Sequence, residues 1–235
     1  MKSSAVQLAS RGFLPDEAFA EYENLSEEEA VLLTASAKPH ERTAGIMLLA
    51  RTGNTRYLPE FCRLLAAEKK LYTKLALCDA LVRFGDNAIP FLLPLLGAIG
   101  GNQHKKAGLV DIGKTSFPLP RDIAARVLIR IGPSVLPFMK TILEEGSYAQ
   151  KCEALDVIGH IAYHNYDDSC SDVLVREYQR SIADDLIRWK CVRAFQSFQS
   201  EAVKTILKNV LLSDPHPVIR KEAERSLERM TNRKK

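Results

Sequence analysis

One stretch of the sequence carries residue types that can hold a nucleotide phosphate. Residues 108–115 read GLVDIGKT and match the phosphate-binding pattern G-x-x-x-x-G-K-[ST] letter for letter. In that chemistry the loop leaves a buried strand and opens a helix, whose backbone N–H groups hold the phosphates. Here the polar, glycine-rich residues GGNQHKKA precede the loop, and Pro118 and Pro120 follow it. Because these prolines prevent a helix from beginning at Lys114, we expect no nucleotide at this lysine.

Two histidines are spaced so that one helix face could present both to a metal ion. His160 and His164 are four residues apart, and Asp167 and Asp168 follow closely. The related zinc pattern H-E-x-x-H carries a glutamate directly after its first histidine, and this sequence does not. The helix is also expected to end near Tyr163, which leaves the second histidine in a loop. We therefore predict no metal site here.

The remaining motifs give no support to nucleophilic or cofactor chemistry. The sequence has no G-x-S-x-G elbow and no order of cysteine and histidine that indicates a nucleophile. Its five cysteines form no CxxC pair and fall mostly within apolar helical patterns, which favours small buried thiols in a reducing cytoplasm. We predict no catalytic residue, no cofactor and no metal.

Composition indicates a soluble globular protein. Apolar residues make up 46% of the chain and charged residues 26%, both ordinary values for that class. The first residues, MKSSAVQLASRGF, contain no uninterrupted apolar run and make a poor signal peptide. The most apolar segment, residues 88–99, is too short to span a membrane. We expect a cytoplasmic protein with no membrane partner.

A helical pattern repeats six times along the chain. Six segments begin with a cation and carry small or apolar residues three and seven positions later, and five of them carry another at ten. Positions 0, 3, 7 and 10 form one stripe of an α-helix. The anchor cations are Arg42, Lys74, Arg121, Lys151, Arg188 and Arg220. A second, shorter helical pattern lies between these segments and has proline near its start at residues 59, 90 and 137.

A unit of about thirty residues that holds two helices is typical of an α-solenoid. We therefore predict an all-α fold, a right-handed α-α superhelix of about six helix pairs, which forms a single domain over residues 1–235. Residues 1–25 are expected to form an N-terminal cap, and residues 231–235 a basic tail. Residues 100–120 form an insertion within the third repeat.

Within this pattern, residues 214–223 read DPHPVIRKEA and resemble the signature D-P-x-x-x-V-R-x-x-A of HEAT-like repeats, the short phycobilisome-lyase type. A recurring G-[DN]-x-x-x-[LI]-P-x-[FL]-x-x-L-L is similar to the first helix of that repeat. The resemblance covers roughly residues 26–230. It implies that the second helices line a concave face and that each anchor cation bonds an aspartate of a neighbouring repeat.

Two enzyme-related alternatives follow from the same resemblance. His40 and Glu41 resemble one of the His-Glu pairs with which HEAT-like deoxyhypusine hydroxylase holds two irons, but that family needs several pairs and this chain has one. A chaperone similar to the phycobilin lyases would share the repeats, although no further motif supports it.

The insertion is both basic and apolar. Its basic residues are His104, Lys105, Lys106 and Lys114, and its apolar residues are Leu109, Val110, Ile112, Phe117 and Leu119. A loop of this length in a compact repeat is often functional or disordered. In one interpretation the insertion folds over one edge of the concave groove. In the other it is an ordered loop without a function.

Positive charge recurs on the second helices, five and nine residues after the anchors. These positions share a face away from the apolar stripe, so stacked repeats would form a basic ladder along the concave groove. The ladder comprises Arg51, Arg83, Arg126, Arg130, His160, Arg193, Arg225 and Arg229. We expect it to bind a partner, with Trp189 as an aromatic contact. Favourable interaction of arginine with the C-terminal helix dipole is the alternative.

We therefore predict a noncatalytic HEAT-repeat scaffold or adaptor that binds a protein partner of acidic character through its concave face. The alternative is a nucleic-acid-binding protein that resembles HEAT-like alkylpurine DNA glycosylases, with Trp189 near Asp184 and Asp185 as the counterpart of their aromatic and carboxylate groups. Acids outnumber bases in residues 1–60, and bases outnumber acids from Arg188 onward. This asymmetry fits either partner, and also head-to-tail self-association.

Overall fold

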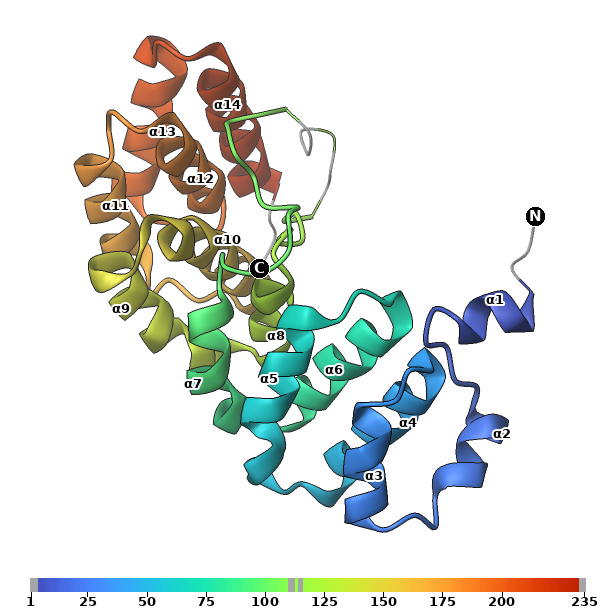
Figure 1. Cartoon of the computed structure of the whole chain (residues 1–235). Coiled ribbons are helices and arrows are strands. Elements are labelled where there is room, and N and C mark those ends of the chain that lie inside the picture. The colour runs from blue at the N-terminus through green and yellow to red at the C-terminus, as the bar shows by residue number, and fades with distance from the viewer. Residues whose placement is uncertain (1–3, 110–112, 114–115, 233–235) are drawn as a thin grey trace. The chain divides into compact units, whose positions relative to one another are not determined.

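The structure, a computed structural model, describes residues 4–109, 113 and 116–232. These residues form fourteen α-helices and five short 3-10 helices and no strand, which confirms the all-α prediction (Figure 1). The chain divides into two compact units, residues 1–95 and 96–235. Folding as the single domain expected from the repeat stays a prediction. Within the described residues, no helix is both long and apolar enough to cross a membrane.

The first unit stacks its helices in two layers. Helices α4 and α6 pack against each other in the inner layer, with α3 against α4 and α5 against α6 in the outer layer. The helices of this unit are α1 (Ala5–Ala9), α2 (Asp16–Phe19), α3 (Glu27–Thr34), α4 (Pro39–Thr52), α5 (Leu58–Ala67), α6 (Leu71–Arg83) and α7 (Ile89–Leu92).

Local sequence explains where these helices begin and end. Ser26 and Glu29 form a capping box at the start of α3, and Pro39 occupies the first turn of α4. Gly53 ends α4 in the left-handed region at φ 68°. A Cβ on Gly45 would lie 2.6 Å from the carbonyl oxygen of Ala30, so the glycine is what lets α3 and α4 approach closely.

The second unit continues the same architecture with longer helices. Helices α8, α10, α12 and α14 form the inner layer, each in contact with the next, while α9, α11 and α13 form the outer layer. Their bounds are α8 (Ile123–Ile131), α9 (Leu136–Glu145), α10 (Tyr148–Asn165), α11 (Ser171–Arg180), α12 (Asp185–Phe195), α13 (Glu201–Ser213) and α14 (Pro217–Asn232). Helix α10 ends at Asn165, two residues beyond the end near Tyr163 expected from the sequence, and so includes His164; Tyr166 follows in the left-handed region.

Two of the six anchor cations bond a carboxylate of the next repeat, and one of these acids, Asp214, is the aspartate that the resemblance implies. Arg42 donates from Nε and Nη2 to the carboxylate of Glu68, at 2.9 and 3.0 Å. Arg188 makes the same pair of bonds to Asp214, at 2.9 and 3.4 Å. Each acid lies 26 residues after its arginine, which is the step from a second helix to the end of the next first helix.

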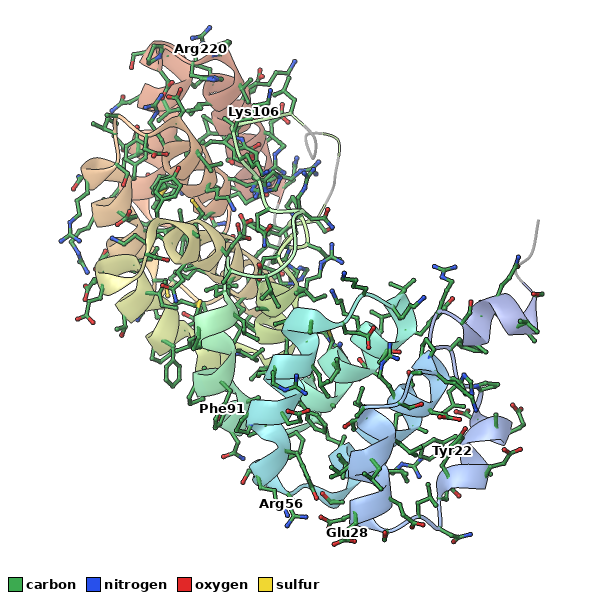
Figure 2. The ribbon with its side chains drawn as sticks, viewed as in Figure 1. Tyr22, Glu28, Arg56, Phe91, Lys106 and Arg220 are labelled. Carbon is green, nitrogen blue, oxygen red and sulfur yellow. The ribbon has the colours of Figure 1, made fainter. Side chains whose placement is uncertain are left out.

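The described parts of the insertion pack against α10 and α12 of the second unit; whether the insertion has a function stays a prediction. Phe117 is buried and lies with its ring centroid 6.1 Å from that of His160 and 6.0 Å from that of Tyr163. Gly159 makes room for it, because a Cβ there would lie 2.4 Å from Phe117 Cζ. Figure 1 shows the described parts of the insertion in green beside α12, and Lys106 marks them in Figure 2.

Candidate functional site

The predicted ladder is exposed in the first unit, where it borders a groove. Arg51 and Arg83 occupy the last turns of α4 and α6, and both are at least partly exposed. Between these helices lies a cavity of about 440 Å³. We call it the α4–α6 groove, and its lining residues are Met47, Ala50, Arg51, Ala76, Asp79, Ala80, Val82 and Arg83. Most of this lining is apolar, and its charged members are the exposed Arg51, Asp79 and Arg83.

Arg51 is held in place by two neighbours from the N-terminal cap. Its Nη1 donates to Glu23 Oε1 at 2.9 Å, and its guanidinium carbon lies 4.2 Å from the ring centroid of Phe19. Both partners of the ion pair are about half exposed, with side-chain exposures of 49% and 50%. Such a pair contributes little to stability, so a carboxylate of a binding partner can replace Glu23 at small cost.

In the second unit the ladder positions differ in exposure. Arg126 and Arg130 of α8 are exposed, and Arg126 Nε donates to the carbonyl of Pro120 in the insertion at 2.7 Å. Arg229 is half-buried. His160 is half-buried beneath Phe117, where desolvation, aided by His164, lowers its pKa to about 4.

Three residues of α12 and α14 that were expected to be exposed in the groove are buried instead. Arg193 and Arg225 are buried, and the Trp189 side chain is 1% exposed. Every residue of α12 from Leu186 to Phe195 is buried, because α10, α11, α14 and the insertion surround the helix. The spacing of residues along one helix cannot show that a segment distant in sequence, here the insertion, will bury that helix.

Acidic side chains of α10 pair with the buried cations of α12, and the buried cation of α14 pairs with an acid of its own helix. Lys190 Nζ donates to Glu153 Oε1 at 3.1 Å and to Asp156 Oδ2 at 2.8 Å. Arg193 Nη2 donates to Asp156 Oδ1 at 2.6 Å. On α14, Arg225 bonds Glu222. This buried ion network comprises Glu153 and Asp156 of α10, Lys190 and Arg193 of α12, and Glu222 and Arg225 of α14.

Burial and pairing shift the acids of the network in different directions. Burial raises the pKa of Glu153 to about 7, although Lys190 opposes the shift. Burial also raises the pKa of Glu222. Burial alone would raise the pKa of Asp156 too, but the adjacent Arg193 and Lys190 hold it below its usual value. Asp156 is therefore the permanent anion of the network.

The sequence does contain a signal for this network, but the prediction considered only the cations and overlooked the acids at equivalent positions. Two and five residues after the last three anchors stand Glu153 and Asp156, then Lys190 and Arg193, then Glu222 and Arg225. Charges at equal positions of consecutive inner helices lie opposite each other when the repeats stack. Acids on α10 at the positions where α12 carries cations therefore indicate internal pairing of these two helices rather than a surface ladder.

The insertion contributes one titratable group to the same region. The His104 ring lies edge-on to Trp189 with centroids 5.0 Å apart, and its Nδ1 lies 3.9 Å from Asp156 Oδ2. Desolvation, with the nearby charge of Arg193, lowers the pKa of His104 to about 4, so the imidazole is neutral at neutral pH. The guanidinium of Arg193 lies 4.3 Å from the Trp189 ring centroid. Trp189 is thereby closed off from solvent.

The histidines, Glu41 and the cysteines singled out from the sequence form no metal-binding cluster among the described residues. The His160 and His164 rings lie with centroids 4.4 Å apart, but the described residues hold no group of three or more possible metal ligands. Glu41 accepts hydrogen bonds from Ser36 and Lys38. All five cysteines are buried, as predicted, and no two of them form a disulfide.

Lys114 and most of the GLVDIGKT motif lie outside the described residues. In the described flanks, residues 96–109 contain no strand and residues 116–120 no helix. The absence of nucleotide binding stays a prediction.

The stacked helix pairs define an all-α protein of the α-solenoid class. No family model matches the chain, and no curated protein matches it. Among solved structures, it is similar to human deoxyhypusine hydroxylase in complex with glycerol, at 13% identity and a TM-score of 0.40. The alignment covers 95% of this chain and 94% of that one. A likeness this distant carries no argument about function.

Proposed function

We propose that the protein is a noncatalytic adaptor of short HEAT-like repeats that binds an acidic segment of a protein partner in the α4–α6 groove. The observation that carries this proposal is the groove itself, whose mostly apolar lining carries two exposed arginines, Arg51 and Arg83, and one exposed acid, Asp79. An apolar cavity bordered by arginines suits a peptide that offers an apolar side chain beside a carboxylate.

The chemistry of arginine supports a carboxylate partner. A guanidinium presents a rigid fork of donors that matches a carboxylate in a bidentate manner, and arginine is enriched among residues that dominate binding energy. Stacking on Phe19 keeps Arg51 oriented before a partner arrives, which lowers the entropy lost on binding. Arg126 and Arg130 offer further positive charge on α8 for a second contact.

The alternative nucleic-acid function loses its aromatic contact in this structure. Trp189 is enclosed by His104, Arg193 and the insertion, so it cannot stack on a base. The cations beside it are paired with Asp156 and Glu153, so they offer few free charges to phosphates. We therefore propose a protein partner.

The proposal can be tested without knowing the partner. A library of short random peptides is selected on the immobilised full-length chain, and we expect enriched peptides to combine an acid with a large apolar residue. Ala76→Trp fills the groove from α6, whereas Ala66→Trp, on the exposed face of the outer helix α5, is the matched control. We expect Ala76→Trp to weaken binding by about tenfold or more and the control to leave it unchanged.

Equal binding to both variants would overturn the proposal. So would selection of peptides without acidic residues. A gel-shift series with single- and double-stranded oligonucleotides completes the test, because tight binding that weakens steeply with salt would favour the nucleic-acid function instead.

A further inference from the structure

Two segments of the chain, one in each unit, carry surface charge of opposite sign. Residues 12–37 contain seven acids and no lysine or arginine. Residues 96–143 contain seven lysines and arginines and two acids, Asp111 and Asp122. Asp111 lies outside the described residues, and Asp122 is 1% exposed at the start of α8. The exposed charges that the structure describes in residues 96–143 are therefore all positive.

In the acidic segment, α3 presents a carboxylate beside apolar side chains. Glu28, Val31 and Leu32 lie three and four residues apart and share one face of the helix. Leu32 is 74% and Val31 is 43% exposed, and Glu28, labelled in Figure 2, is exposed as well. Terminal repeats of a solenoid normally carry a polar outer face, so these apolar side chains on the first outer helix indicate a contact surface. We call the three residues the acidic face.

In the basic segment, α8 and the insertion combine positive charge with an apolar side chain. Arg126 and Arg130 lie four residues apart on α8, and both are exposed. Arg126 Nε donates to the carbonyl of Pro120 at 2.7 Å, which holds the arginine against the chain next to Leu119, a side chain that is 58% exposed. A carbonyl orients the guanidinium without neutralising its charge. We call Leu119, Arg126 and Arg130 the basic face.

The two faces complement each other. Each joins an exposed leucine to charge of one sign, and the two signs are opposite. In a contact between them, the leucines exclude water while the charges fix the register and speed the encounter. We propose that the acidic face of one copy of this chain binds the basic face of a second copy.

The form of the assembly follows from the difference between the faces. A contact between unlike surfaces is heterologous, so each end of a dimer offers a face to a further copy and association continues head to tail. Neither face includes a lining residue of the α4–α6 groove. Self-association therefore goes beyond the proposed function and leaves the groove to a partner.

Sedimentation velocity of the full chain tests the association. We expect the average mass to rise as the concentration increases from about 1 µM to about 1 mM, the range of weak binding constants. Salt raised from about 0.1 M to about 1 M should reduce the association, because it shortens the screening length from about 10 Å to about 3 Å. Leu212→Gln, at a leucine of α13 that is 83% exposed and outside both faces, should associate like wild type.

Two neutral double variants identify the faces. Glu28→Gln with Leu32→Gln removes the acidic face, and Leu119→Gln with Arg130→Gln removes the basic face; all four side chains are exposed, so both variants should fold. We expect each variant alone to associate more weakly than wild type by about tenfold or more. An equimolar mixture should form 1:1 dimers and nothing larger, because each variant retains the face that the other lacks.

Several results would overturn the proposal. These are a monomer at every wild-type concentration, association of either variant alone as strong as that of wild type, or a mixture that stays monomeric. Oligonucleotide binding that the Leu119 and Arg130 variant loses, without self-association of wild type, would assign the basic face to nucleic acid instead. Ala76→Trp, which fills the α4–α6 groove, should associate like wild type, so failure of this proposal is distinguishable from failure of the proposed function.

Discussion

His104 of the insertion lies edge-on against Trp189 of α12, with ring centroids 5.0 Å apart. Aromatic pairs in this geometry contribute beyond the area that they bury. The contact joins the insertion to the centre of the second unit, above the buried ion network. It explains why α12 is buried on all sides although its sequence carries three cations.

Trp189 is the single tryptophan of the chain, so its fluorescence reports whether the insertion covers α12. We predict that His104→Ala increases quenching of this fluorescence by acrylamide, because removal of the ring opens a path to the indole. Lys105→Ala, at an exposed neighbour, should leave quenching unchanged. Equal quenching in wild type and His104→Ala would show that the insertion does not protect the tryptophan.

Docking of the insertion should weaken in acid. Burial lowers the pKa of His104 from 6.5 to about 4, so its contribution to stability is fully present above pH 6.5 and is lost as the pH falls toward 4. The lowered pKa of His160 also makes the fold less stable as the pH falls. The raised pKa of Glu153 has the opposite effect. We therefore compare His104→Phe with wild type by urea unfolding. The variant should gain stability relative to wild type between pH 7 and pH 5, and a constant difference would contradict this.

The buried pair of Arg188 and Asp214 should be far more sensitive than an exposed pair. Its side chains are 6% and 4% exposed, and removal of one partner leaves an uncompensated buried charge. We predict that Asp214→Asn lowers the free energy of unfolding by about 3–5 kcal/mol. Glu27→Gln breaks the exposed pair with Arg56 and should cost about 0–1 kcal/mol. Similar losses in both variants would contradict the assigned burial.

Lys190 should control the ionisation of Glu153. Lys190→Met removes the cation that opposes the raised pKa of Glu153, so that pKa should rise further. A buried carboxyl with a raised pKa contributes stability that is lost as pH increases through it. We predict that Lys190→Met loses more stability relative to wild type at pH 8 than at pH 6, measured by chemical unfolding. A loss independent of pH would mean that Glu153 does not depend on this lysine.

The more exposed members of the ladder should affect binding and not stability. Replacement of Arg51 and Arg83, the two exposed arginines of the α4–α6 groove, with glutamine should change the melting temperature little, since exposed charges contribute little to stability. Binding of a selected acidic peptide should weaken, mainly through a slower association rate. Unfolding of the double variant, or unchanged binding, would indicate that these arginines act only on their own helix ends.

The repeat was predictable because its signals are local. Apolar spacing, the proline at residue 39 and the glycine at residue 53 specify helices without reference to the rest of the chain. The burial of Arg193 was not predictable from its own helix, because it depends on Asp156 one repeat away and on His104 in the insertion. Sequence reasoning found the cations of the α4–α6 groove but not its apolar floor, which forms only when Met47 and Ala80 of different helices meet.

Binding of a partner segment between α4 and α6 can be observed directly by hydrogen exchange of the full chain with and without a selected acidic peptide. We predict new protection confined to the C-terminal halves of α4 and α6, around Arg51 and Arg83, with exchange in the second unit unchanged. Protection confined to the second unit, or none in α4 and α6 at saturating peptide, would contradict binding in the groove.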